Sequence, residues 1–241
     1  MRIGACQTPE ILADVDAAVG VVQDFAREAD IAGADLLLFP ECFLQGYLVT
    51  DEHVRGQALE IGSPACNSVL ARLAGIEQML VLGMIERAGD GFYNTAVVVV
   101  GGRVVGRYRK TFLTSGEQVF TPGDDYPAFD RGGVRFGINI CSDTQHEQAA
   151  AAVAARGAQV LLVPAQNMMR RESAFHWQPR HFEIRARRVR ETGMWLVSAD
   201  VTGERDSDRI GLGPTGFLNP AGETVSQVPT GTTGMVLADI P

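Results

Sequence analysis

The sequence predicts an α/β fold in which helices cover the outer faces of two packed sheets. Short apolar runs alternate with longer amphipathic runs along the chain, as strands and helices do in this class. Two stretches also resemble each other, GADLLLFPE at 33–41 and GAQVLLVPA at 157–165, and each follows a helical pattern. This echo predicts two similar halves about a pseudo-twofold axis. We therefore expect a sandwich layered as helix, sheet, sheet and helix.

The first half of the chain supplies apolar runs of strand length. They lie at 2–7, 35–39, 78–86, 95–100 and 103–109. Asp14 is a typical N-cap for the helical pattern at 14–32, and Pro64 begins a shorter one at 64–75. Gly101-Gly102 suits a two-residue turn between antiparallel strands. This hairpin argues against a barrel of eight parallel strands.

The second half repeats the alternation and ends in strands. Its apolar runs lie at 134–140, 158–164, 194–200, 215–219, 223–228 and 233–240. An Ala-rich helix is predicted over 146–156 and a long, Arg-rich helix over 173–192. No linker interrupts the pattern, so residues 1–241 are expected to form a single domain.

Composition limits the classes of function. With 241 residues and 46% hydrophobic content, the chain suffices for one sizeable core. The 21 Lys and Arg against 29 Asp and Glu give a net charge of −8, so we expect no nucleic-acid partner. No apolar stretch reaches the ~18 residues of a membrane span, and no signal peptide is recognisable, so we expect no membrane partner. Four scattered cysteines favour reduced thiols in the cytoplasm, with no metal and no cofactor.

Three reactive side chains follow directly after predicted strands, where α/β folds concentrate catalytic groups. They are Glu41, Lys110 and Cys141. A helix beginning after Cys141 can stabilise a thiolate, and apolar surroundings can raise the pKa of Glu41 until it serves as a base. Lys110 offers a fixed cation for an oxyanion. Singly, each residue type is more often an inert thiol or a surface charge, so the set carries the argument.

Together these residues resemble the Glu-Lys-Cys triad of the nitrilase superfamily, the carbon–nitrogen hydrolases. Three motifs carry the resemblance: LLLFPECFLQGY at 36–47, GRYRKTFL at 106–113 and GINICSD at 137–143. Glu117, just ahead of FTPG at 120–123, matches a second active-site glutamate of the family. The resemblance extends over nearly the whole chain. It implies the four-layer α-β-β-α sandwich of the carbon-nitrogen hydrolase type.

The resemblance also implies a chemistry, the hydrolysis of a non-peptide C–N bond of a small amide through a thioester. Glu41 takes the thiol proton and Cys141 attacks the carbonyl carbon. Lys110 and the backbone N–H of Ser142 stabilise the oxyanion, while Glu117 holds Lys110 or the substrate nitrogen in place. Ammonia or an amine is released.

The chain departs from the family pattern at several positions. Ser142 stands where many members have an aromatic residue, and Asp200 replaces a terminal Asn. The family's Arg-Ala-x-Glu-Asn segment is degraded at Arg188, Arg190 and Glu191. The pair Ser142-Asp143 favours an amidase, and an N-carbamoyl amidohydrolase and a nitrilase stay open as alternatives.

Substrate contacts are predicted in two places. Phe43 and Tyr47, close to the proposed base, are candidates for a pocket wall or for core packing. Asn167 and Arg170 lie just past a predicted strand, in the region that lines the pocket in relatives. An arginine there can bind a substrate carboxylate, although exposed surface is the usual fate of this residue.

The sequence leaves two alternatives to the Glu-Lys-Cys hydrolase open, and it also suggests an assembly state. A Cys-His hydrolase would pair Cys141 with His146, His176 or His181. A catalytically silent member would bind a metabolite or a partner protein through the same fold, which the full set of active-site residue types argues against. By similarity, we expect a homodimer or a higher homo-oligomer, with the helix at 173–192 as a natural contact.

Overall fold

Strands and helices alternate along the whole chain, and a computed structural model describes all residues, 1–241. The first half contains β1 (Arg2–Pro9), α1 (Val15–Ile31), β2 (Leu36–Leu38), α2 (Asp51–Gln57), α3 (Pro64–Ala71), β3 (Met79–Ala88), β4 (Gly91–Val100), β5 (Arg103–Arg109) and β6 (Ala128–Arg131). The second half contains β7 (Val134–Ile138), the 3-10 helix η1 (Cys141–Gln145), α4 (Glu147–Ala155), β8 (Val160–Pro164), β9 (Met168–Arg170), α5 (Arg171–Thr192), β10 (Trp195–Ala199), β11 (Val201–Glu204), β12 (Arg209–Leu212), β13 (Gly216–Leu218), β14 (Thr224–Gln227) and β15 (Gly234–Asp239).

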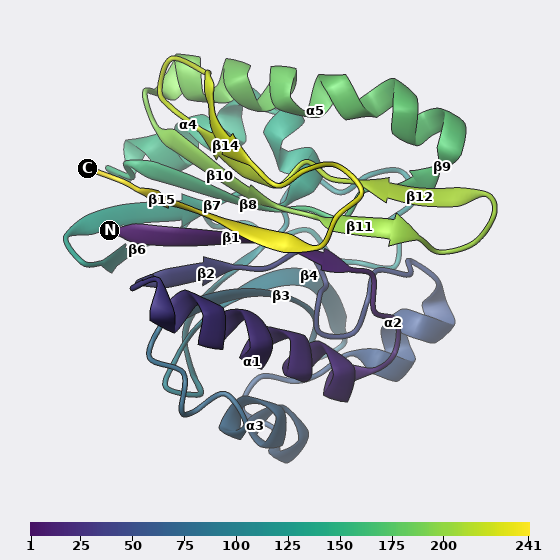
Figure 1. Ribbon diagram of the computed structural model, residues 1–241. Coiled ribbons are helices and arrows are strands. Elements are labelled where there is room, and N and C mark those ends of the chain that lie inside the picture. Colours follow the sequence, from purple (N-terminus) through teal and green to yellow (C-terminus); the bar gives the residue numbers. More distant parts are fainter.

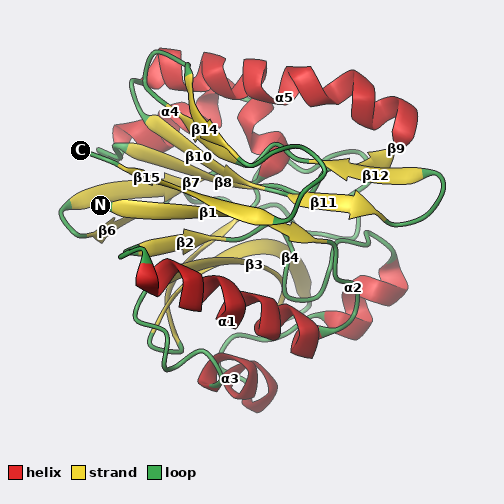
Figure 2. Cartoon of the chain, in the orientation of Figure 1, coloured by secondary structure: helices red, strands yellow, loops and turns green.

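Two sheets face each other at the centre of the molecule (Figure 1). The larger sheet has nine strands in the order β5-β4-β3-β2-β1-β11-β12-β9, with β15 also paired to β1. The smaller sheet has six strands in the order β14-β13-β10-β8-β7-β6. Figure 2 shows α1 and α3 outside the larger sheet and α4 and α5 outside the smaller one. The predicted α/β sandwich of four layers is confirmed.

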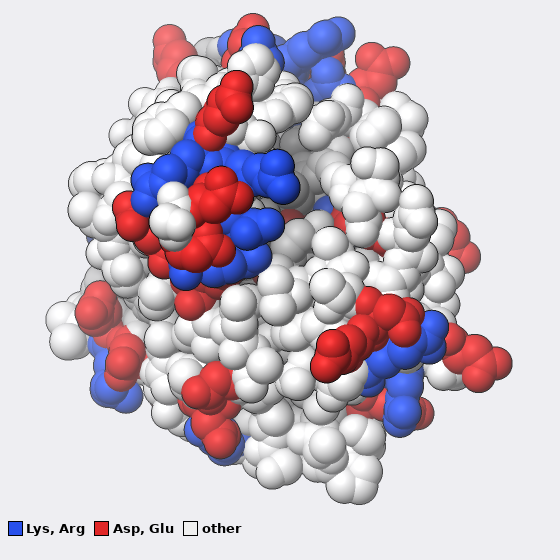
Figure 3. Space-filling model, turned by 90° about the vertical axis from the view of Figure 1, so that its right-hand side faces the viewer, with Lys and Arg blue, Asp and Glu red and all other residues white.

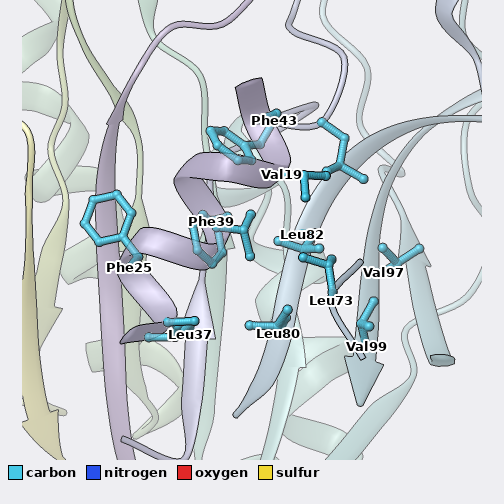
Figure 4. Close-up of a cluster of buried hydrophobic side chains, with 14 of the residues drawn as sticks. Val19, Phe25, Leu37, Phe39, Phe43, Leu73, Leu80, Leu82, Val97 and Val99 are labelled. Carbon is cyan, nitrogen blue, oxygen red and sulfur yellow. The ribbon is translucent and has the colours of Figure 1, made fainter. Parts of the chain in front are cut away.

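Alternation of side chains along the buried strands creates the layers. Leu37 points into a cluster shared with α1, part of which is drawn in Figure 4, while its neighbours Leu36 and Leu38 point into the cluster between the sheets. On the smaller sheet, Leu162 faces the other sheet and Leu161 faces α4 and α5. Successive strand residues point to opposite faces, so a continuous apolar run fills two cores at once.

The two halves each contain a strand, a helix and a parallel strand, as the sequence echo predicts. β1 pairs in parallel with β2 across α1, and β7 pairs in parallel with β8 across α4. Asp14 caps α1 by accepting a hydrogen bond of 2.9 Å from Ala17 N–H. Because parallel strands end at the same edge of a sheet, the residues that follow β7 and β8 come together, and the residues that follow β2 meet them across the two sheets, where Glu41 N–H donates to the Ala165 carbonyl.

The hairpin of β4 and β5 is also as predicted. Gly101 and Gly102 both have positive φ, 53° and 71°, and a Cβ on Gly102 would meet the carbonyl oxygen of Leu70 at 2.6 Å. Glycine is needed here for its conformation and for its lack of a side chain.

None of the helices is both long and apolar enough to cross a membrane.

Candidate active site

Cys141 occupies a strained turn directly after β7. It begins η1 and has a φ of 45°, in the left-handed region. This region costs a residue with a side chain about 1–2 kcal/mol, so the surrounding bonds must enforce it. The carboxylate of Asp143 accepts a 2.8 Å hydrogen bond from Ile140 N–H, and Thr144 Oγ1 donates at 2.8 Å to the Cys141 carbonyl. The turn is therefore tied on both sides of the thiol.

Asp143 also fixes the distance between the thiol and the segment that carries Lys110. Its buried carboxylate accepts hydrogen bonds from Tyr108 Oη at 2.7 Å, from Thr111 N–H at 3.2 Å and from Phe112 N–H at 2.8 Å. Ordinary solvation is lost at such a buried charge, and several donors must replace it. The carboxylate thus joins the end of β5 to the turn after β7.

The ammonium of Lys110 lies between two buried carboxylates. Its Nζ donates to Glu41 Oε1 at 2.7 Å and contacts both oxygens of Glu117 at 2.9 Å. Asn94, on β4, bridges the same two carboxylates, since its Nδ2 donates to Glu41 Oε1 at 2.7 Å and to Glu117 Oε1 at 3.0 Å. All four side chains are at most 1% exposed. Such a buried, fully hydrogen-bonded cluster holds its groups in one geometry.

The remaining carboxylate oxygens are held by backbone groups. Glu41 Oε2 accepts from Gln166 N–H at 3.1 Å, and Glu117 Oε2 accepts from Thr114 N–H at 2.8 Å. The backbone N–H of Glu41 donates to the carbonyl of Ala165 at 3.2 Å. Glu41 and Ala165 occupy matching places in the two echoing segments, so the two halves meet at the proposed base.

The two glutamates differ in their proton affinity although they share their partners. Burial raises the pKa of Glu41 to about 7; the charge of Lys110 opposes the shift and that of Glu117 adds to it. For Glu117 burial also acts upward, but Lys110 and the Thr114 N–H outweigh it, so its pKa is lowered. Near neutral pH Glu41 can therefore both take up and release a proton, while Glu117 keeps its charge.

The pKa values of the Cys141 thiol and the Lys110 ammonium are both raised. Burial raises the pKa of the Cys141 thiol, and the charge of Glu41 raises it further. Burial acts to lower the pKa of Lys110, but the facing carboxylates raise it above its ordinary value. The thiol is therefore protonated and needs a base, while the ammonium remains charged.

Cys141 opens into a cavity of about 230 Å³. Its wall is formed by Thr114, Cys141, Ser142, Thr144, Gln145, Asn167, Met169, Trp177, His181, Ile184 and Arg185. The backbone N–H of Ser142 donates to no other group in the turns and loops, while its hydroxyl donates to the Phe112 carbonyl at 2.6 Å. A free N–H beside the thiol is the donor that an oxyanion requires.

Of the predicted substrate contacts, some lie at the cavity and others lie elsewhere. Asn167 lines the cavity, whereas Tyr47 is not part of its wall and packs against the cluster that contains Cys42 and Phe120. Burial and the charge of Glu41 raise the pKa of Tyr47. Phe43 is 3% exposed and packs on Phe39 in the core under α1, with a ring separation of 5.4 Å. The structure thus places Phe43 in the core and not along the cavity.

Arg170 lies outside the cavity, on the surface. Its side chain is 74% exposed and its Nε is 3.7 Å from Asp208. Other ion pairs of the same region, Arg171 with Glu204 and Arg209 with Asp206, belong to the ends of α5, β11 and β12. Figure 3 shows this face with its mixed basic and acidic side chains beside a hollow. The cation that the structure places in the cavity wall is Arg185.

The three histidines of the Cys-His alternative are not placed as bases for the thiol. His146 stacks on Phe112 with ring centres 4.0 Å apart, and His176 is exposed. His181 lines the cavity, but burial and the nearby Arg185 lower its pKa to about 3. A group that binds a proton so weakly is a poor general base at neutral pH.

Two site residues were missed by sequence reasoning. Asn94 is a polar residue in the strand run GFYNTAVVVV, and this interruption of the apolar pattern was the available signal. Arg185 belongs to a helix with five arginines between Arg180 and Arg190, and sequence spacing alone does not tell which of them faces the cavity.

The chain is similar to known carbon–nitrogen hydrolases over most of its length. The carbon-nitrogen hydrolase family model matches residues 2–241. A nitrilase of Pyrococcus abyssi is 33% identical over 90% of this chain and 80% of its own length. An (R)-stereoselective amidase of a Pseudomonas species is 28% identical over 88% of this chain and 76% of its own length.

A solved structure of an amidase from Nesterenkonia sp. superposes with a TM-score of 0.86 at 26% identity, covering 100% of this chain and 90% of that one. Another structure of that amidase records the Michael addition of acrylamide at its active-site cysteine. The chain therefore belongs to the carbon-nitrogen hydrolase family of the nitrilase superfamily, on its amidase-like side, and is an enzyme that hydrolyses carbon–nitrogen bonds other than peptide bonds.

Proposed function

We propose that the enzyme is an amidase that cleaves a small amide through a thioester on Cys141. The observation that carries this proposal is the buried Lys110, whose Nζ lies 2.7 Å from Glu41 and 2.9 Å from Glu117. One buried cluster thus contains Glu41, a carboxylate whose pKa is about 7, together with a fixed cation and a second carboxylate. Roles for Glu41, Lys110 and Cys141 follow from the chemistry of each group.

The first half of the reaction forms the thioester. Glu41 Oε2 accepts only one hydrogen bond, whereas Oε1 accepts two, so Oε2 is the oxygen with free basic capacity. It takes the thiol proton as Cys141 Sγ bonds to the amide carbon. Lys110 Nζ and the Ser142 N–H stabilise the negative oxygen of the tetrahedral intermediate. Glu41 then gives its proton to the nitrogen, the C–N bond breaks and ammonia leaves.

The second half returns the enzyme to its starting state. Glu41 takes a proton from water as the water oxygen bonds to the thioester carbon. The C–S bond then breaks, the carboxylic acid leaves, and the proton returns to the Cys141 thiolate. Throughout both steps Glu117 keeps Lys110 charged and in place.

An amide substrate is favoured over an N-carbamoyl compound or a nitrile. The pair Ser142-Asp143 after the nucleophile supports this choice, as does the similarity to two amidases. Similarity to a nitrilase keeps the nitrile as the second candidate. The cavity of about 230 Å³ limits the acyl group to a short chain.

Ammonia release from three neutral four-carbon compounds tests the proposal: butyramide, propylurea, which is an N-carbamoyl amine, and butyronitrile. We expect the amide to give the largest kcat/KM. A larger value for the nitrile or the carbamoyl compound would assign the enzyme to that branch instead. No turnover of any of them, together with no reaction of Cys141 with a thiol-reactive amide, would favour a catalytically silent protein.

We also propose that residues 1–241 act as one catalytic unit within a homo-oligomer in the cytoplasm. A shared core cluster between the sheets supports the single unit, and four free cysteines support a reducing compartment. The long, exposed faces of α5 are available for a contact between copies. Light scattering checks the mass, and a monomer would overturn the assembly proposal.

A further inference from the structure

Arg185 is a buried cation in the wall of the cavity that holds Cys141. Its side chain is 2% exposed, although arginine is almost never buried without a partner. No other side chain of the cavity wall carries a permanent charge, because the wall contains neither lysine nor carboxylate and His181 has its pKa lowered to about 3. The inner surface of the cavity is thus polarised by one guanidinium.

Asp200 balances this charge without using the donors of Arg185. The nearest approach, Nη2 to Oδ2, is 3.9 Å, which is too long for a hydrogen bond. The oxygens of Asp200 are instead taken up by Asn167, through its N–H at 2.9 Å and its Nδ2 at 2.5 Å, and by Val201 N–H at 2.9 Å. The acid therefore lies beside the guanidinium without bonding to it and is already supplied with donors.

Most N–H groups of Arg185 remain free for a ligand. A guanidinium has five donors, and Arg185 uses one nitrogen, Nη1, which donates to the Pro214 carbonyl at 3.0 Å. Nε and Nη2 make no hydrogen bond within the protein. Neither belongs to the fully buried polar atoms that lack a partner, so both keep some access to the cavity. Two adjacent nitrogens of a planar fork match the two oxygens of a carboxylate.

We propose that Arg185 binds a carboxylate of the substrate, so that the enzyme acts on short amides that carry an acid group at the other end. This inference rests on the proposed amidase function and names its substrate class. A carboxylate of this kind occurs in monoamides of short dicarboxylic acids and in N-carbamoyl amino acids. The first source fits the amide preference, and the two are separated in the experiment.

The test compares acid-bearing and neutral substrates of the same size. Glutaramate and N-carbamoylglycine are assayed beside valeramide, and the ratio of kcat/KM values is the readout. We expect glutaramate to exceed valeramide by about 10- to 100-fold, the range of a charge-assisted hydrogen-bonded pair. In Arg185→Gln this ratio falls toward one, mainly through KM, and Arg185→Lys restores part of it.

Asp200→Asn separates recognition from mere structural support. Removal of Asp200 leaves the positive charge of Arg185 without a nearby anion, so the preference for glutaramate should rise, opposite to the effect of Arg185→Gln. A role in folding alone would lower turnover of both substrates in both variants. Arg187→Gln, at a 68% exposed arginine two residues away, is the matched control and should leave the ratio unchanged.

Each outcome has a distinct meaning. Equal turnover of glutaramate and valeramide by the unaltered enzyme would overturn the carboxylate proposal and leave the amidase proposal intact. A loss of preference in Arg170→Gln but not in Arg185→Gln would also overturn it. If neither amide is turned over, protection of Cys141 from iodoacetamide by glutarate still tests the site. Absence of this protection would then count against it.

Discussion

The turns after β2 and β7 place a cysteine in the same unusual conformation but in different surroundings. Cys42 has a φ of 48° and Cys141 a φ of 45°. Cys42 is 0% exposed, packs with Val54 and Phe120, and donates from Sγ to Asn94 Oδ1 at 3.4 Å. Cys141 instead lines a cavity that also reaches Arg185.

Strain and a position after a strand are common to both turns, so we infer that access to the cavity decides which thiol reacts. The turn after β2 is sealed by the backbone of β3, since a Cβ on Gly83 would meet Pro40 O at 2.2 Å and Cys42 N at 2.4 Å. This close contact leaves Glu41 in contact with Lys110 and excludes solvent from the Cys42 thiol. The turn after β7 leaves its thiol at the cavity wall.

The largest expected effect is that of Cys141→Ala. Loss of the nucleophile removes the covalent route, so amide turnover should fall by more than about 10⁴-fold, beyond the range of a single acid–base group. Cys42→Ala is the matched variant and should keep turnover within about threefold, because only a weak thiol hydrogen bond is lost. Steady-state ammonia release measures both. Comparable losses in the two variants would contradict the distinction.

Glu41→Gln should follow in size. The amide keeps the shape of the side chain but takes no proton, so kcat should fall by about 10²–10⁴-fold. Glu60→Gln, at a glutamate whose side chain is 52% exposed, is the control and should have no effect. If Glu41→Gln retained full activity, the base would have to be sought elsewhere.

Asn94→Ala is expected to have a smaller but specific effect. Its loss removes a bridge between Glu41 and Glu117 and leaves their charges less well solvated, so the pKa of Glu41 should rise. We predict a loss of about 10- to 100-fold at pH 7 that is partly recovered at higher pH. A loss that is the same at every pH would indicate a structural effect only.

The pH dependence of kcat/KM should report Glu41. Its pKa is about 7 and its active form is the carboxylate, so activity rises with pH through this value and then levels off. One pH unit below the pKa should already cost about a factor of ten. A flat profile between pH 5 and pH 8 on a substrate without ionisable groups would exclude Glu41 as the titrating base.

Much of the framework was predictable because it is encoded locally. Local residues alone indicate several elements: the apolar runs of β2 and β8, the N-cap Asp14 of α1 and the turn at Gly101. The short strands β9, β11 and β12 were missed, because three or four residues become a strand only through pairing with distant partners. The same applies to α2, whose seven residues show little periodicity.

The candidate site divides in the same way. Glu41, Lys110 and Cys141 stand at the ends of apolar runs, so their positions were accessible from sequence order. The side of a long helix that faces a cavity depends on packing, so the sequence alone does not single out Arg185 on α5, and the predicted contact Arg170, on β9, lies on the surface instead. The core position of Phe43 beside Glu41 is likewise a matter of which face of the turn is covered.

Alkylation by iodoacetamide tests the central claim most directly, because the reagent is itself a small amide and reacts with activated thiols. Peptide mass mapping of the folded enzyme should find a single adduct on Cys141, formed at a rate that saturates with reagent and falls in Glu41→Gln. Cys42 should remain unmodified. The account would be contradicted if Cys42 were labelled before Cys141, or if Glu41→Gln left the rate of Cys141 labelling unchanged.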